Sequence, residues 1–231
     1  KALLIEGARR IGKSTIAEEF AKNEYKSYIL IDFSATTETI KSYFTNYIND
    51  LDTFFLMIST AFGVRLYERD TLFIFDEVQF FPPARQAVKQ LVADGRYDYL
   101  ETGSLISIRE NVQDILIPSE EGRIKMYPMS FDEFLWAMNE DLLFDYLKTC
   151  FTERKPLENG LHQKAMLNFK KYILVGGMPK VLSIFLENRQ RFEEADAEKR
   201  DILSLYRSDI MKIKGGYRGR TLILFDQIPG F

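Results

Sequence analysis

The chain has 231 residues, 46% of them hydrophobic and 28% charged, with a formal net charge of −3 at pH 7. This composition is ordinary for a globular protein that is large enough to form a hydrophobic core. The slightly negative net charge excludes nucleic-acid binding driven by overall positive charge, although a local basic patch stays possible. Cys150 is the single cysteine and His162 the single histidine, which excludes a disulfide framework and a cysteine-based zinc site.

The sequence carries no sign of membrane insertion or secretion. No apolar run reaches the ~18 residues that indicate a membrane span, and no signal peptide is visible. We therefore expect a cytoplasmic protein with no membrane partner. The chain opens inside a predicted strand, has no initial methionine and stops abruptly after residues 223–231, so we expect a portion of a longer protein.

The first segment combines a strand, a glycine-rich loop and the start of a helix. Leu3–Ile5 is a short apolar run, typical of a strand buried on both faces of a parallel sheet. Residues 7–14 then read GARRIGKS, which matches G-x-x-x-x-G-K-[ST], the phosphate-binding loop. The two glycines let successive backbone N–H groups turn toward one anion, and the following helix adds its N-terminal dipole. We predict that the nucleotide is bound by Gly7, Ala8, Arg9, Arg10, Ile11, Gly12, Lys13, Ser14 and Thr15.

Within this loop, the side chains have different expected roles. Lys13 is expected to reach the β- and γ-phosphates, and the Ser14 hydroxyl is expected to bind Mg²⁺. Arg9 and Arg10 either contact phosphates or a partner, or are simply solvated side chains.

Helical and strand patterns alternate up to residue 66. Thr15–Asn23 suits a helix, Tyr28–Phe33 a second strand, and residues 40–66 one or two amphipathic helices. Apolar residues recur at helical spacing in the last stretch, at Phe44, Tyr47, Ile48, Leu51, Phe54, Phe55 and Ile58. Core packing explains this stripe more simply than a cofactor site.

Two carboxylates end the third predicted strand, Thr71–Glu77. Apolar residues followed by Asp76 and Glu77 form the Walker B pattern. Mg²⁺ prefers hard oxygen ligands and keeps several waters, so Asp76 is expected to hold the metal through water beside Ser14. Glu77 is not needed for the metal, and its natural role is to orient and deprotonate the attacking water. The pair therefore indicates ATP hydrolysis.

The remaining strands complete the predicted fold. A helix from Pro82 through Ala93 is followed by strands at Tyr97–Glu101 and Arg123–Tyr127. Strands that alternate with helices predict an α/β fold, here a P-loop NTPase three-layer sandwich with a five-stranded, mainly parallel sheet. We assign residues 1–127 to this ATPase core.

Pro128 marks a change to a helical pattern. Ser130–Glu133 is a capping box, and helices are predicted over residues 131–139, 142–151, 161–175, 181–187 and 193–212. We predict a helical lid over residues 128–192. Residues 214–220 read as a flexible basic linker, and we assign residues 193–231 to the start of a truncated C-terminal domain.

Three further candidate residues lie outside the loop and the third strand. Ser104 follows the fourth strand and could contact the γ-phosphate or the water, the role called sensor 1; Thr102 is its rival, and a plain turn serine is the alternative. Arg123 could stabilise transition-state charge, in cis or in trans, or lie on the surface. The break Gly176–Pro179 could bring the backbone at Pro179 close to the adenine, or merely join two helices.

Together these motifs resemble a family of prokaryotic AAA-type ATPases, in which the ATPase domain precedes a restriction-endonuclease-like domain of unknown function. Pro128–Phe131 and Gly176–Pro179 are the stretches that point to this family. The resemblance implies ATP as the ligand, a helical lid, and a sensor strand between the Walker A and Walker B strands. The Gly-x-Pro stretch is also similar to the adenine-contacting motif of signal-transducing (STAND) relatives. Residues 206–229 resemble the beginning of the second domain, but no nuclease-like motif is completed in them.

The leading hypothesis is an AAA-like ATPase that hydrolyses ATP with Mg²⁺, in which Lys13, Glu77, Ser104 and Arg123 serve catalysis. The alternative is a nucleotide-dependent switch with little turnover that gates a partner or a missing C-terminal domain. A small-molecule kinase is less favoured because the lid is not Arg-rich, and a GTPase because no Asn-Lys-x-Asp motif occurs. A homo-oligomer or protein partner stays open, and DNA association rests only on the resemblance and the short basic tail.

Overall fold

The computed structural model describes residues 2–104, 121–212 and 217–228 of the chain. These residues form two compact units. One unit contains residues 1–8 and 12–127, and the other contains residues 9–11 and 128–231. Each unit has its own hydrophobic core, so we describe them separately.

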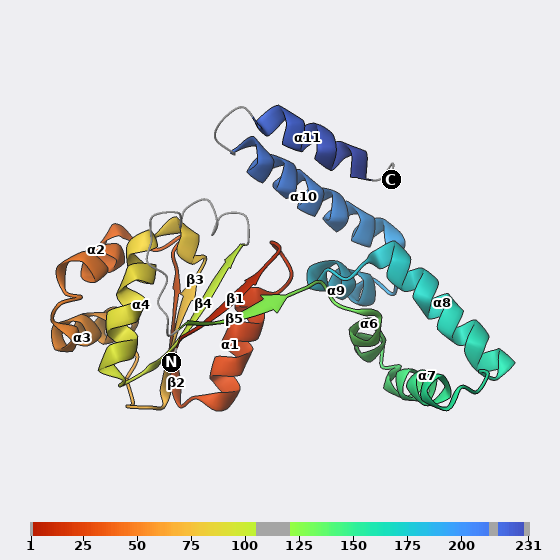
Figure 1. The fold of residues 1–231 in the computed structure, drawn as a ribbon, viewed down its shortest axis with the longest axis horizontal. Coiled ribbons are helices and arrows are strands. Elements are labelled where there is room, and N and C mark those ends of the chain that lie inside the picture. Colours follow the sequence, from red (N-terminus) through yellow and green to blue (C-terminus); the bar gives the residue numbers. More distant parts are fainter. Residues whose placement is uncertain (1, 105–120, 213–216, 229–231) are drawn as a thin grey trace. The chain divides into compact units, whose positions relative to one another are not determined.

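The first unit is built on a five-stranded parallel sheet (Figure 1). Its strands are β1 (Ala2–Gly7), β2 (Ser27–Asp32), β3 (Thr71–Asp76), β4 (Asp98–Ser104) and β5 (Glu121–Met126). The strand order is β2-β3-β4-β1-β5, and every neighbouring pair is parallel. The predicted P-loop NTPase α/β fold is confirmed, including the expected place of β4 between the strands that carry the phosphate loop and the two acids.

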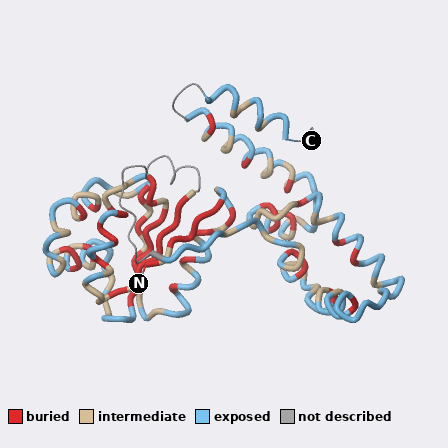
Figure 2. The backbone as a smooth tube through the Cα atoms, in the orientation of Figure 1, coloured by how far each residue is buried: buried red, intermediate tan, exposed pale blue. Residues whose placement is uncertain are grey.

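Helices cover both faces of this sheet. They are α1 (Lys13–Glu24), α2 (Glu38–Asn46), α3 (Leu51–Phe62) and α4 (Pro82–Asp94), with a short 3₁₀ turn, η1 (Val78–Phe80), before α4. α1 packs its small residues Ala17 and Ala21 on one face of the sheet, against a cluster that includes Ile5 and Ile74. α2, α3 and α4 pack on the other face, around a larger cluster. Strands β1, β3 and β4 are consequently buried through most of their length, whereas the edge strand β5 is exposed from Gly122 to Lys125 (Figure 2).

The aromatic stripe predicted in residues 40–66 belongs to this larger cluster. Phe44, Phe54, Phe55 and Ile58 are buried in it, which confirms the core interpretation. The ring of Phe75, the residue before Asp76, packs edge-on against Phe44, with ring centroids 5.5 Å apart. Aromatic packing of this kind stabilises the fold by more than the buried area alone, and it holds the end of β3 in place.

The second unit is helical. Its helices are α6 (Phe131–Ala137), α7 (Asp141–Glu153), α8 (Asn159–Val175), α9 (Pro179–Glu187), α10 (Phe192–Met211) and α11 (Arg218–Gln227). The predicted capping box at Ser130 and Glu133 begins α6. The main core joins residues of α6, α8, α9 and α10, namely Phe134, Val175, Val181, Leu182, Phe185, Ala195 and Ile202.

The end of the chain differs from the sequence interpretation. Residues 213–216 lie outside the described residues, but Arg218–Arg220, predicted to belong to a flexible linker, begin helix α11. α11 runs beside α10 (Figure 1), with an ion pair of 2.8 Å between Arg207 and Asp226. The half-buried side chains of Leu222 and Phe225 explain why this stretch is helical, since they lie on one helix face.

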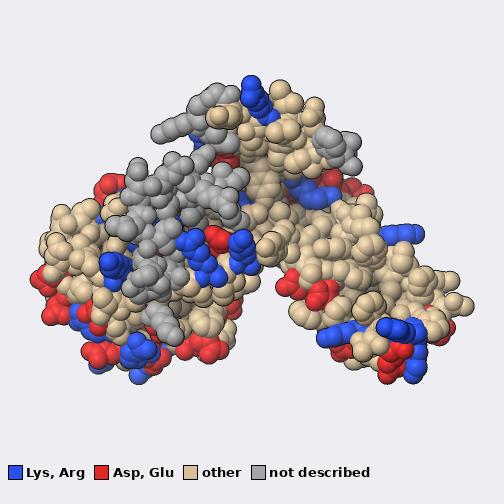
Figure 3. All heavy atoms as spheres, in the orientation of Figure 1, with Lys and Arg blue, Asp and Glu red and all other residues tan. Residues whose placement is uncertain are grey.

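Two surface properties bear on function. Acidic and basic side chains are interspersed on the face drawn in Figure 3, in line with the small net charge. Among the described residues, we find no helix that combines the length and the apolarity of a membrane span.

The turn between α8 and α9 gives a first prediction. Gly177 lies against the backbone of Met129, which donates its N–H to the Gly177 carbonyl at 2.7 Å. A Cβ on Gly177 would stand 2.2 Å from the Met129 carbonyl oxygen, so backbone must move to admit it. We expect Gly177→Ala to lower the free energy of unfolding of this unit by about 1–3 kcal/mol in a denaturant titration.

Gly219→Ala provides the matched control for this substitution. Gly219 lies in helix α11, and a Cβ there would meet no atom within 4 Å. Its replacement is expected to leave stability unchanged or raised by a few tenths of a kcal/mol. Equal stability of the two variants would show that the contact between Gly177 and Met129 is not close in solution.

Candidate functional site

The phosphate loop joins the end of β1 to the start of α1. Gly12 is the N-cap of α1 and has φ 93° and ψ 17°, a left-handed conformation that glycine adopts without steric cost. The Lys13 side chain is buried, and its Nζ donates to the carbonyl oxygens of Ala8 at 2.8 Å and Gly7 at 3.3 Å. The loop thus wraps around an ammonium group at the positive end of a helix, an arrangement that suits an anionic ligand.

Ser14 and Asp76 meet although 62 residues separate them. The Ser14 hydroxyl donates to Asp76 Oδ1 at 2.7 Å. Asp76 is the last residue of β3, and Ser14 lies in the first turn of α1, so the parallel sheet brings both to its carboxyl edge. A hydroxyl and a carboxylate are hard oxygen donors, and the pair therefore fits Mg²⁺.

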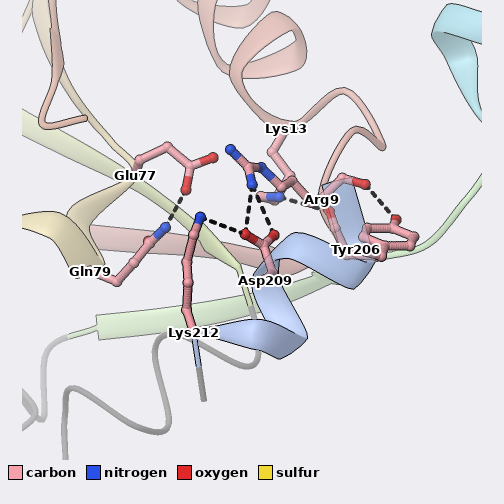
Figure 4. Close-up of polar contacts among 8 residues, drawn as sticks. Arg9, Lys13, Glu77, Gln79, Tyr206, Asp209 and Lys212 are labelled. Carbon is pink, nitrogen blue, oxygen red and sulfur yellow. Dashed lines mark hydrogen bonds and ion pairs between the residues drawn. The ribbon is translucent and has the colours of Figure 1, made fainter. Parts of the chain in front are cut away.

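Glu77 occupies an unusual backbone conformation. It has φ 53° and ψ 47°, in the left-handed region that costs a residue with a Cβ roughly 1–2 kcal/mol. Its N–H donates to Thr102 Oγ1 at 3.2 Å, and its carboxylate accepts a hydrogen bond from the amide of Gln79 (Figure 4). Strain of this kind persists where the surroundings fix it, and functional sites are a common place for it.

Two residues of the site stand out beyond the predicted set. Thr102, which the sequence offered only as a rival to Ser104, donates its hydroxyl to Asp76 Oδ1. Gln79, which the sequence analysis missed, is buried beside Glu77 in η1. The sequence did hold a signal for Gln79, because it is a polar residue between the apolar residues Val78 and Phe80.

The remaining candidates belong to other elements of the chain. Ser104 is half-buried at the end of β4 and pairs in register with Gly7. Arg123 lies on the edge strand β5, in register with Leu4, and is exposed. Pro179 is the first residue of α9 in the second unit. The structure thus brings together Lys13, Ser14, Asp76 and Glu77, which are the residues that the two Walker motifs supply.

Arg9 and Arg10 differ in their surroundings. Arg9, which groups with the second unit, donates to Asp209 Oδ2 at 2.8 Å, and its carbonyl oxygen accepts from the Tyr206 hydroxyl at 2.7 Å (Figure 4). Burial raises the pKa of Asp209, but hydrogen bonds from Arg9 and Lys212 outweigh it and hold that pKa below its usual value. Arg10 is exposed and has a positive φ of 68°.

The chain is similar to known proteins over more than half of its length. A family model described as an AAA domain matches residues 1–135. A Haemophilus influenzae protein described as an uncharacterized protein is 25% identical over 183 residues, which make up 78% of this chain and 40% of the relative. The chain therefore spans about two fifths of that relative's length. The solved structure of C. elegans PCH-2 covers 80% of this chain at 12% identity, with 53% of its own chain matched and a TM-score of 0.41.

Proposed function

The chain belongs to the AAA domain family, and we propose that it is an ATPase that hydrolyses ATP with Mg²⁺ at the carboxyl edge of its parallel sheet. Membership of this family supports a nucleotide-binding, ATPase-like function. The observation that carries the finer proposal is the hydrogen bond of 2.7 Å between Ser14 and Asp76, because it joins the two Walker motifs in one site.

In this proposal the loop binds the phosphates. The backbone N–H groups of residues 7–15 face the anion, and the Lys13 ammonium exchanges the carbonyl oxygens of Gly7 and Ala8 for phosphate oxygens. Ser14 and Asp76 would hold Mg²⁺, with phosphate oxygens and water as the other ligands. When bound, the metal supplies positive charge that stabilises the transferring phosphoryl group.

Glu77 is the proposed general base. Its position directly after Asp76 puts a second carboxylate at the same edge of the sheet, where it orients the attacking water and accepts its proton. We assign Ser104 the role of contacting the γ-phosphate or the water, and Arg123 the role of stabilising transition-state charge. Pro179 is proposed to contact the adenine.

A slow nucleotide switch is the second candidate function. The hydrogen bond from Gln79 to the Glu77 carboxylate favours it, because a base that already has a hydrogen-bond partner is less available to water. In that case ATP binds tightly, turnover is small, and the bound state gates a partner or a further domain.

The same proposal covers organisation, partners and location. We propose an ATPase core over residues 1–127, a lid over 128–192 and the start of a C-terminal domain over 193–231. Since AAA-type proteins often need a neighbour to complete the site, we propose a homo-oligomer or a protein partner. ATP as the substrate leads us to propose a cytoplasmic location, and DNA is retained only as an additive to test.

Metal removal tests the proposed function. We expect the full-length protein to release phosphate from ATP with Mg²⁺ and to slow by at least about 100-fold in excess EDTA, because phosphoryl charge is then not neutralised. Restoring Mg²⁺ should restore the rate, and parallel reactions with DNA test that additive. Phosphate release that is equal with and without EDTA would contradict the metal-assisted mechanism, and tight ATP binding without release would favour the switch.

A further inference from the structure

Thr102 has no assigned role in the proposed mechanism, yet its hydroxyl connects both acids of the site. The side chain is fully buried on β4, the strand next to β3. It donates to Asp76 Oδ1 and accepts the Glu77 N–H at 3.2 Å. We propose that Thr102 is a positioning residue that fixes the metal-binding carboxylate and the backbone of the general base in one geometry, an inference that rests on the proposed function.

The hydrogen-bonding capacity of a threonine hydroxyl fits this role. A hydroxyl has one O–H donor and two acceptor lone pairs, and Thr102 uses the donor for Asp76 and an acceptor for Glu77. Asp76 Oδ1 also accepts from Ser14 at 2.7 Å, so two hydroxyls fix the same carboxylate oxygen. The second Asp76 oxygen then keeps a defined direction.

The contact with Glu77 acts on its backbone. Glu77 follows Asp76, the last residue of β3, so its N–H lies beyond the paired residues of the sheet and needs another acceptor. Thr102 supplies that acceptor at a buried position. Its branched Cβ restricts χ1, so the hydroxyl itself is held in place.

Strand register explains why Thr102 reaches both acids. β4 pairs with β3 so that Glu101 stands opposite Phe75, and the next residue along β4 therefore follows beside Asp76. Ser104 lies two residues farther along, in register with Gly7 of the phosphate loop. Thr102 thus acts by positioning Asp76 and Glu77, and the proposed direct contact with the phosphate belongs to residues closer to the phosphate loop.

The test compares three variants of the full-length protein. Thr102→Val keeps the shape and removes the hydroxyl, and Thr102→Ser restores the hydroxyl. Thr71→Val is the matched control, since Thr71 is also fully buried and its hydroxyl accepts the Tyr67 N–H at 2.7 Å and pairs with Ser27 at 2.8 Å, at the amino end of β3. A thermal unfolding curve for each variant tests whether it is folded.

Two readouts are measured for each variant: ATP turnover, and the factor by which Mg²⁺ tightens ATP binding. We expect Thr102→Val to lower kcat by at least about 30-fold, because a misplaced base loses part of the ~10²–10⁴-fold that general base catalysis contributes, with KM changed less than threefold. We expect it to reduce the Mg²⁺ effect on binding by about tenfold, which corresponds to about 1.4 kcal/mol. Thr102→Ser should recover most of both, and Thr71→Val should match the parent.

The outcomes separate this inference from the function on which it rests. If the parent binds Mg²⁺–ATP without turnover, the ATPase proposal fails, and the Mg²⁺ effect on binding still decides the role of Thr102. If Thr102→Val behaves like Thr71→Val in the readouts that the parent supports, the positioning role is overturned. If Mg²⁺ does not tighten ATP binding to the parent, the link to the metal-binding carboxylate is overturned as well.

Discussion

A Lys13→Ala variant is expected to bind ATP at least about 100-fold more weakly than the parent, a loss of about 3 kcal/mol. The Lys13 side chain is buried and donates to the Gly7 and Ala8 carbonyls, and we propose that its ammonium binds the phosphates. Alanine would remove the proposed charge-assisted hydrogen bonds to phosphate and leave the loop without that cation. Isothermal titration with ATP and Mg²⁺ measures the change.

Lys22→Ala is the control for Lys13→Ala. Lys22 lies on the same helix, α1, but it is exposed and pairs with Glu18 and Glu19. Its removal is expected to leave ATP affinity within about twofold of the parent, since exposed ion pairs contribute little. Affinity that falls equally in both variants, or in neither, would contradict nucleotide binding at this loop.

The second large effect is expected from Glu77→Gln. The substitution keeps the size of the side chain and removes the proposed base, so kcat should fall by about 10²–10⁴-fold while ATP affinity stays within a few-fold of the parent. The αL backbone at Glu77 and its N–H bond to Thr102 do not depend on the carboxylate, so the fold of the turn should persist. Phosphate release and ATP titration, measured side by side, separate the two quantities.

Glu24→Gln is the matched control for this variant. Glu24 ends helix α1 and is exposed, so loss of its charge should not alter turnover. A Glu77→Gln protein that hydrolyses ATP as fast as the Glu24→Gln protein would exclude Glu77 as the base.

The core of the site could be predicted because its signals are local in the sequence. The phosphate loop needs its glycines and Lys13 at fixed spacing, and the two acids follow a buried apolar strand. Alternating strands and helices predict a parallel sheet, and a parallel sheet brings such strand ends to one edge. The contact between Ser14 and Asp76 follows from those two facts.

The different neighbours of Thr102 and Ser104 could not be predicted from the sequence. Residues two apart on a strand point to the same face, so both remained candidates. Only the register of β4 against β3 and β1 places Thr102 beside Asp76 and Ser104 beside Gly7.

Gln79 and helix α11 were missed for a related reason. The contact of Gln79 with Glu77 depends on the left-handed backbone at Glu77, and local sequence does not specify such a turn. In α11, Gly219 and the basic residues beside it suggested a linker, but packing along α10 makes the segment helical. Tertiary contacts override weak local preferences in such segments.

The most direct test of Mg²⁺-assisted hydrolysis at this site is a single-turnover measurement with the protein in excess over ATP. It reports the bond cleavage itself, separately from product release. We predict that the parent converts bound ATP to ADP when Mg²⁺ is present, and that Glu77→Gln retains ATP intact under the same conditions. Bound ATP that remains intact on the parent would contradict the ATPase proposal and leave the nucleotide switch, and equal ADP formation by both proteins would contradict the role of Glu77.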